Sequence, residues 1–257
     1  MNHLSKESKL FMVLGCFLIA NAIIAEFIGV KIFSVEESLG FNKFDINLFG
    51  VDGLSFNMSA GVVTWPIVFV MTDIINEYFG LKGVKFLSYL AAILIAFAFL
   101  VVGLAIQLSP ADFWLIQNIN GSNLNMNAAF SAIFGQGMWI IVGSISAFLI
   151  GQIADVRIFH AIKKITGGQK LWLRATGSTL VSQLIDSFVV IFIAFYINPQ
   201  YHWSWKMVAA IALVNYTYKF IIALAMTPFL YIIHSVIDWI LGKELAHRLI
   251  ENSAKED

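Results

Sequence analysis

The sequence predicts an all-α membrane protein with six transmembrane helices and both termini in the cytoplasm. Hydrophobic residues make up 59% of its 257 residues and charged residues only 12%, and the mean hydropathy is +0.81. A composition of this kind lies outside the range of soluble domains. The formal net charge is zero, which offers no basic surface to nucleic acid. We therefore expect the lipid bilayer, and no nucleic acid, as a partner.

Six apolar runs have the roughly 20-residue length that a hydrocarbon core about 30 Å thick requires. In a single domain covering residues 1–257, the spans are predicted near 10–33, 56–76, 84–108, 128–155, 174–197 and 206–233. The first run is longer than the apolar part of a typical signal peptide, so we expect an uncleaved first helix. Apart from Lys219, twelve Lys and Arg residues fall in or next to the predicted cytoplasmic segments and three in or next to the outer ones, which indicates cytoplasmic termini.

The connecting segments carry weaker patterns. Residues 44–57 alternate polar and apolar side chains around Asp52-Gly53, which predicts a small outer β-hairpin between the first two helices. Residues 156–174 are basic and amphipathic, and we expect a short helix on the inner membrane surface there. The polar tail after Trp239 is expected to extend into solvent. Pro66 should kink the second span and free a carbonyl group within the membrane.

A polar stripe in the fifth span is the clearest sign of a binding site. Thr179, Ser182, Gln183 and Asp186 are spaced i, i+3, i+4 and i+7, which places them on one helical face. A carboxylate at this depth costs about 2.5 to 3.5 kcal/mol on insertion scales, so it needs a partner or a ligand. Four hydrogen-bonding groups on one face predict a lined site in the helix bundle.

The second span has a complementary pattern. Trp65, Phe69 and Asp73 follow one another at four-residue steps, which predicts an aromatic wall that leads to a carboxylate. Glu77 comes one turn later, at the cytoplasmic end. There it could serve the site, or it could pair with the nearby Lys82 and Lys85.

Further polar residues lie in the first and last spans. Lys219 is deep in the last helix and needs a counter-charge, for which Asp186 and Glu26 are the candidates. A purely structural ion pair of Lys219 remains an alternative to a role in binding. The predicted substrate site lies between helices one, two, five and six, and its candidate residues are Asn21, Trp65, Phe69, Asp73, Glu77, Ser182, Gln183, Asp186, Asn215 and Lys219.

Signatures of enzymes and cofactors are largely missing from the sequence. The five His have no metal-ligand spacing and Cys16 is the only cysteine, so we expect no metal and no cofactor. No Gly-rich phosphate loop is present, so this chain should not hydrolyse ATP. An intramembrane enzyme that uses Ser178 or Ser182 with Lys219 stays open as an alternative.

Two ordered motifs resemble those of the queuosine precursor transporters, a vitamin-uptake-transporter-like family. The first is Gly61-x3-Trp65-Pro66 followed by Thr72-Asp73-x3-Glu77-Tyr78-Phe79-Gly80. The second comprises Asp155-x-Arg157-Ile158-Phe159-His160, Leu171-Trp172-Leu173-Arg174 and Ser178-Thr179-x2-Ser182-Gln183-x2-Asp186-Ser187. Trp65 stands where such proteins more often have Phe, which keeps the aromatic character.

The resemblance implies import of deazaguanine bases, the cyano and aminomethyl precursors of queuosine (preQ0 and preQ1), across a bacterial inner membrane. One carboxylate can accept both donors of a guanine-like edge, Gln183 suits the neighbouring positions, and Trp65 and Phe69 could stack on the base. A substrate-binding subunit of an energy-coupling-factor transporter, with separate ATPase partners, is the alternative within transport. The driving force, the preferred precursor and the oligomeric state stay open, with a homodimer as one arrangement.

Overall fold

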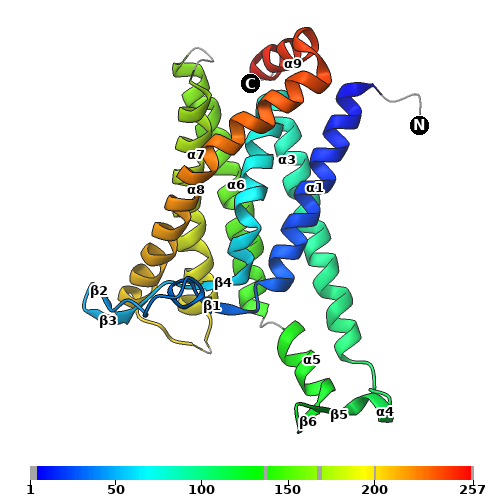
Figure 1. Cartoon of the computed structure of the whole chain (residues 1–257), viewed down its shortest axis with the longest axis vertical. Helices are drawn as coiled ribbons and strands as arrows, with labels where there is room; N and C mark the ends of the chain where they lie inside the picture. Colours follow the sequence, from blue (N-terminus) through cyan, green and yellow to red (C-terminus); the bar gives the residue numbers. More distant parts are fainter. Residues whose placement is uncertain (1–4, 136–137, 167–169, 200, 256–257) are drawn as a thin grey trace.

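The computed structural model describes residues 5–135, 138–166, 170–199 and 201–255. The protein is mostly helical, and the described residues contain five helical segments long and apolar enough to cross a membrane. They are α1 (Lys6–Ile28), α3 (Trp65–Ile106), the segment 126–165 that includes α5 (Met126–Phe134) and α6 (Met138–Ile165), α7 (Leu171–Ile191) with its π-helical extension η2 (Phe192–Ile197), and α8 (Trp205–Leu241). Figure 1 shows α1, α3, α6, α7 and α8 side by side, whereas α5 lies apart from them.

Helix α3 contains two of the predicted spans and reverses direction between them. Gly80 interrupts its helical geometry with φ 66° and ψ −172°. The ring of Phe11 in α1 contacts Phe79, next to this glycine, whereas the ring of Phe27 near the other end of α1 stacks on Phe99. The two parts of α3 therefore run antiparallel beside α1 (Figure 1). Gly80 suits this reversal because glycine adopts positive φ without steric cost.

Helix α3 begins later in the sequence than predicted, and this changes the expected effect of Pro66. Strand β4 (Asn57–Ser59) pairs with β1 (Ile32–Ser34), and the 3-10 helix η1 (Ala60–Val63) then leads into α3. Pro66 consequently lies in the first turn of α3, where its missing N–H would have no helical partner anyway. The prediction that Pro66 kinks a helix and frees a carbonyl within the membrane is wrong.

The segment before α3 also contains a short helix and two strands. Helix α2 (Val35–Ser38) precedes strands β2 (Ile46–Leu48) and β3 (Val51–Leu54), which pair antiparallel. Their turn is formed by Phe49 and Gly50, which have φ values of 55° and 77°, and not by Asp52-Gly53. Positive φ at both central positions is typical of tight hairpin turns. Figure 1 shows these strands at the end of the bundle where α8 begins.

The connection between α3 and α5 is likewise ordered. It contains α4 (Asp112–Leu115) and the strands β5 (Ile116–Ile119) and β6 (Ser122–Asn125), which pair antiparallel. Figure 1 shows it extending away from the other helices.

The basic segment 156–174 does not form a separate helix on the membrane surface. Helix α6 continues through this segment to Ile165, and α7 returns beside it: a Cβ on Gly151 would lie 3.5 Å from the Cβ of Asp186, and Gly143 lies near Val190. Lys163 and Arg174 are buried between the helices. The prediction of a short surface helix is therefore wrong for the described part of this segment. Residues 167–169, which include Gly167 and Gly168, lie outside the described residues.

The tail also differs from the expectation. Helix α9 (Lys243–Lys255) packs against α3 through buried Ala246 and partly buried Leu245, Leu249 and Ile250. Near its end, backbone and side-chain atoms of Ser253 lie 3.3 to 3.5 Å from the position that a Cβ on Gly80 would occupy. The tail is thus a docked amphipathic helix whose apolar stripe covers the turn in α3, and it does not extend freely into solvent.

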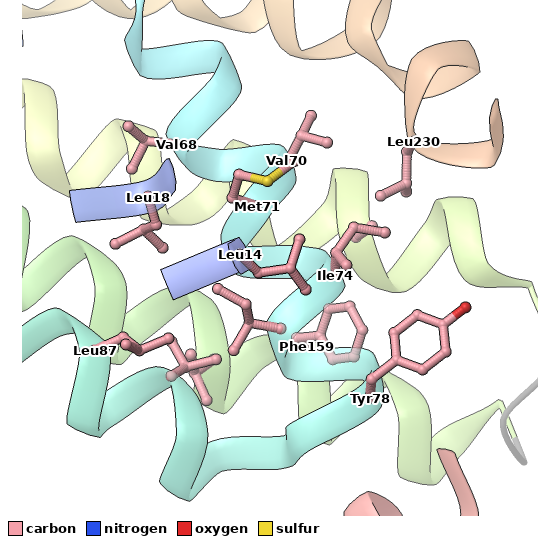
Figure 2. Packing of buried hydrophobic residues seen from close by; sticks show 14 of the residues in the cluster. Leu14, Leu18, Val68, Val70, Met71, Ile74, Tyr78, Leu87, Phe159 and Leu230 are labelled. Atoms are coloured by element: carbon pink, nitrogen blue, oxygen red, sulfur yellow. The ribbon is translucent and has the colours of Figure 1, made fainter. Parts of the chain in front are cut away.

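The largest hydrophobic cluster joins α1, α3, α6, α7, α8 and α9. Figure 2 shows its centre, where Leu14 and Leu18 of α1 and Phe159 of α6 surround the first part of α3. Large apolar side chains such as Phe97 (61% exposed) and Leu100 (59% exposed) point outward instead. An apolar exterior around a polar interior is what a bilayer requires, and the polar groups of that interior form the candidate site.

Candidate functional site

A pocket lies between the first part of α3, the first half of α7 and the middle of α8. About 350 Å³ of space, including its opening, lies between the lining side chains. The lining residues are Pro66, Phe69, Val70, Asp73, Ala175, Thr176, Thr179, Gln183, Ala223, Met226, Thr227 and Leu230.

Asp73 and Gln183 give the pocket its unpaired acceptors. Asp73 is 5% exposed and Gln183 is 4% exposed. Thr179 donates a hydrogen bond of 3.5 Å to Asp73 Oδ2, whereas Asp73 Oδ1 and Gln183 Oε1 have no hydrogen-bond partner among the described residues. An unpaired buried polar atom costs about 1 to 3 kcal/mol, more when it is charged. These two oxygens are therefore suited to a ligand that brings hydrogen-bond donors.

The aromatic wall is divided between two layers. Phe69 lines the pocket directly. Trp65 lies behind it, with ring centroids 6.1 Å from Phe69 and 5.6 Å from Phe148. Phe69 is thus the ring that a flat ligand can stack on, and Trp65 supports its position.

Asp186 and Lys219 form an ion pair about one turn beyond Gln183. Lys219 Nζ lies 2.5 Å from Asp186 Oδ2, and the two side chains are 15% and 17% exposed. This is one of the two pairings expected for Lys219. Neither residue is among those that line the pocket.

The other polar candidates have partners on neighbouring turns or helices. Ser182 donates to Asp155 Oδ1 at 3.0 Å and Ser178 donates to the carbonyl of Ala175, so neither hydroxyl is bonded to Lys219 as a Ser/Lys enzyme would require. Asn21 donates to the carbonyl of Phe17 in its own helix. Asn215 is half-buried and does not line the pocket.

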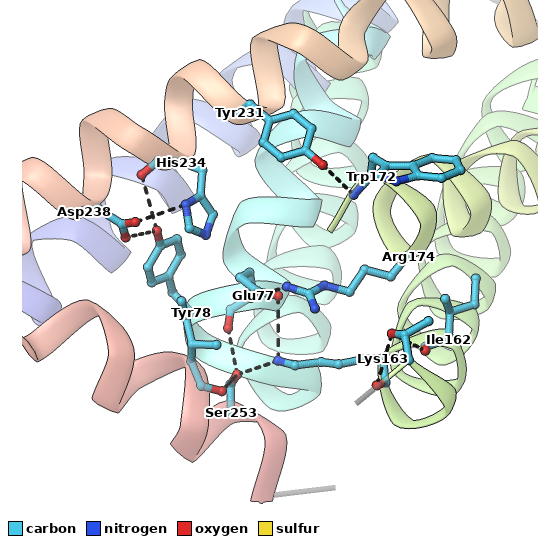
Figure 3. Close-up of polar contacts among 12 residues, drawn as sticks. Glu77, Tyr78, Ile162, Lys163, Trp172, Arg174, Tyr231, His234, Asp238 and Ser253 are labelled. Atoms are coloured by element: carbon cyan, nitrogen blue, oxygen red, sulfur yellow. Dashed lines mark hydrogen bonds and ion pairs between the residues drawn. The ribbon is translucent and has the colours of Figure 1, made fainter. Parts of the chain in front are cut away.

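Glu77 is the centre of a charged cluster at the other end of the pocket (Figure 3). Its carboxylate lies 2.5 Å from Arg174 and 3.7 Å from Lys163. Ser253 of α9 donates to the backbone carbonyl of Glu77 and accepts a hydrogen bond from Lys163. We call these four residues, Glu77, Lys163, Arg174 and Ser253, the Glu77 cluster. The partners of Glu77 thus lie in α6, α7 and α9, and they are not Lys82 and Lys85, the alternative that the sequence suggested.

Asp155 is the buried carboxylate that sequence reasoning did not select as a site residue. It is fully buried in α6, opposite the polar stripe of α7. The fourth span was expected near 128–155, with its end at this residue. A signal was present nevertheless, since Gln152, Asp155, Phe159 and Lys163 share one face of a continuing helix.

Comparison with known proteins gives the family. The profile of the family described as "Putative vitamin uptake transporter" matches residues 59–233, which include all residues of the pocket. The chain is 30% identical over 189 residues to "Probable queuosine precursor transporter" of Bacillus subtilis (strain 168), covering 72% of this chain and 73% of the relative. It is 27% identical over 175 residues to "Queuosine precursor transporter" of Escherichia coli (strain K12), covering 66% and 70%.

A third relative, "Probable queuosine precursor transporter" of Haemophilus influenzae, is 24% identical over 178 residues, covering 67% of this chain and 66% of the relative. No solved structure matches the chain. The relatives are named as transporters, which agrees with the prediction that the chain is not an enzyme. The apolar helices, the buried polar pocket and these matches together show that the chain belongs to the vitamin uptake transporter family that includes the queuosine precursor transporters.

Proposed function

We propose that this protein imports queuosine precursors, the 7-cyano and 7-aminomethyl forms of 7-deazaguanine, across a bacterial inner membrane. The observation that carries the proposal is the pair of unpaired buried acceptors, Asp73 Oδ1 and Gln183 Oε1, beside the ring of Phe69 in one pocket. The names of the relatives supply the class of substrate.

The chemistry of a guanine-like base fits these groups. Its ring N–H and exocyclic amine are two adjacent donors, which a carboxylate such as that of Asp73 can accept together. The amide of Gln183 both donates and accepts, so it can bind the neighbouring carbonyl oxygen of the base. Stacking on Phe69 would add about 1 to 3 kcal/mol, by analogy with aromatic–base contacts elsewhere. Adenine lacks the paired donors and should bind poorly.

The pocket lies between two ion pairs, as a route with alternating access requires. Along α7, Arg174 of the Glu77 cluster precedes the pocket residues and Asp186 follows them. Twelve residues of helix separate Arg174 from Asp186, a rise of about 18 Å. On this proposal, Asp186–Lys219 closes the outer side and the Glu77 cluster closes the inner side, and each opens in turn.

We infer the membrane arrangement from the reversal of α3. If its two parts are counted separately, the proposed arrangement has six passes, with both termini in the cytoplasm, as the bias of Lys and Arg predicts. Strands β1 to β4 then lie on the outer side. Helix α9 and the Glu77 cluster lie on the cytoplasmic side.

Uptake by cells that cannot make deazaguanines tests the proposal. Cells with the wild-type chain should form queuosine in their tRNA from external precursor at low concentration. Asp73→Asn should lower initial uptake by about tenfold or more, because a hydrogen bond to a charged group contributes about 1.5 to 3 kcal/mol. Glu37→Gln, a change of an exposed carboxylate, is the matched control and should transport normally. Wild-type uptake no better than that of empty cells contradicts the proposal.

Reconstitution separates this proposal from the energy-coupling-factor alternative. Purified chain in liposomes should take up precursor without any ATPase. Uptake that requires an added ATPase module would assign the chain to a substrate-binding subunit instead.

A further inference from the structure

Asp155 lies directly behind the pocket and plays no part in the binding described above. It is fully buried, and it is not one of the lining residues. Its Oδ1 accepts a hydrogen bond from Ser182, and the hydroxyls of Ser178 and Thr179 lie close to it. Its Oδ2 has no hydrogen-bond partner among the described residues. A fully buried carboxylate with one unpaired oxygen requires an explanation.

The buried cations near Asp155 are engaged with another carboxylate. The ionisable groups on the elements packed around it include Glu26, Asp73, Glu77, Lys82, Lys85, His160, Lys163, Arg174, Asp186 and Lys219. Lys163 and Arg174 pair with Glu77, and Lys219 pairs with Asp186. His160 bonds Asn76, and Glu26 accepts from Ser144. Within the described part of the chain, Asp155 and Asp73 therefore have no ion-pair partner.

Thr179 connects these two carboxylates. Its hydroxyl donates to Asp73 Oδ2 and also lies close to Asp155. Two neighbouring buried carboxylates that have no ion-pair partner cannot both be ionised without a large cost, because each is poorly solvated and they repel each other. One bound proton removes most of that cost, and the free oxygen of Asp155 is a position where an O–H bond can form.

We propose that Asp155 binds a proton that is transported together with the substrate. This inference rests on the proposed function and adds its driving force. A substrate that donates two hydrogen bonds to Asp73 requires Asp73 to be ionised, and an ionised Asp73 favours the protonated form of Asp155 by Coulomb interaction. Proton and substrate therefore each increase the affinity for the other.

The balance of the step is simple. A proton from the outer side forms an O–H bond at Asp155 while the base binds at Asp73, and no bond of the base breaks. On the inner side the base leaves and the proton returns to water, so that Asp155 is again a carboxylate. One proton moves inward with each base, and an inward proton gradient drives accumulation.

Binding of the cyano precursor to purified protein between pH 5 and 8 tests the inference. This ligand carries no amine that titrates in the window, so changes in affinity belong to the protein. In the wild type, Kd should rise with pH by up to about tenfold per unit above the midpoint of the Asp155 titration, and binding should take up as much as one proton per ligand. The amide introduced by Asp155→Asn cannot ionise, so in this variant Kd should not rise with pH and binding should take up no proton. Glu37→Gln should behave as the wild type.

A second variant keeps the inference testable if Asp155→Asn does not fold. Ser182→Ala removes the hydrogen bond that Asp155 Oδ1 accepts. Because that bond favours the ionised carboxylate, its loss should move the midpoint of the pH dependence to higher pH while binding at pH 5 is kept. An unchanged midpoint contradicts the inference.

Transport measurements in proteoliposomes test the same inference independently of binding. An inward proton gradient should make the wild type accumulate the cyano precursor, whereas Asp155→Asn should exchange it across the membrane without accumulating it. Accumulation by Asp155→Asn, or wild-type binding without proton uptake, overturns the inference and leaves the proposed function intact. Accumulation that depends on a sodium gradient also overturns it. Absence of wild-type binding at every pH overturns both.

Discussion

Lys219 of α8 holds Asp186 of α7 through an ion pair with an Nζ–Oδ2 distance of 2.5 Å. At this point α7 packs closely on α6, since a Cβ on Gly151 would lie 3.5 Å from the Cβ of Asp186. The pair neutralises two charges that would be costly within a bilayer. It also occupies the carboxylate of Asp186, which was predicted from the sequence to bind substrate. The unpaired carboxylate oxygen in the pocket belongs instead to Asp73.

Removing one partner of this pair should destabilise the protein more than removing both. Asp186→Leu leaves a largely buried ammonium without a counter-charge, at a cost of about 3 to 5 kcal/mol. Lys219→Met in the same chain should recover most of that loss. Thermal unfolding of the four proteins in detergent gives the coupling free energy, and additive effects of the two changes would show that the pair contributes nothing.

Phe69 and Trp65 should differ in their effects on binding. Phe69→Ala removes the ring that lines the pocket, and it should weaken both precursors equally, by about 1 to 3 kcal/mol. Trp65→Ala removes the ring behind it and should lower thermal stability, with a smaller effect on Kd. Titration of both ligands against both variants checks this; a larger loss of affinity in Trp65→Ala would place the ligand elsewhere.

Helix α9 should depend on one hydroxyl for its docking. Ser253→Ala removes the hydrogen bonds to the Glu77 carbonyl and from Lys163, at a cost of about 1 kcal/mol each. We expect faster tryptic cleavage at the exposed Arg248. Asn252→Ala, at an exposed neighbouring position, is the control. Equal cleavage rates in the two variants would mean that the apolar face alone holds α9.

Glu36 should make the segment between α1 and α3 sensitive to acid. Burial raises the pKa of its carboxyl, but the N–H of Phe56 and the hydroxyl of Ser34 donate to it, and the pKa is lowered overall. A lowered pKa stabilises the fold above the ordinary Glu value of about 4.3, and the stabilisation is lost as pH falls below it. Wild type should therefore exceed Glu36→Gln in thermal stability at pH 7, and the difference should shrink at pH 3.5. A difference that does not vary with pH would contradict this.

The sequence predicts the helical elements well because apolar length and helical spacing are local properties. The spans near 174–197 and 206–233 correspond to α7 with η2 and to α8, and the spacing of Phe69 and Asp73 places both in the pocket. The pairing of Lys219 with Asp186 was one of two options, and charge alone could not choose between Asp186 and Glu26. That choice depends on how α7 and α8 pack.

The contacts of the Glu77 cluster could not be predicted for the same reason. Lys163, Arg174 and Ser253 reach Glu77 from three different helices, up to 176 residues away in sequence. Basic residues near the ends of spans are typical of cytoplasmic loops, so Lys163 and Arg174 were counted there. Pro66 was misplaced because the strand β4 and helix η1 shift the start of α3 by several residues.

Calorimetric titration of purified protein with both deazaguanines, with adenine as the comparison, tests the central claim most directly. Wild type should bind both precursors in a one-to-one ratio and should not bind adenine measurably. Asp73→Asn should weaken both, and the aminomethyl form more, because its ammonium group also gains Coulomb attraction from the carboxylate. Wild-type binding that Asp73→Asn leaves unchanged, or equal affinity for adenine, would contradict a deazaguanine site between α3, α7 and α8.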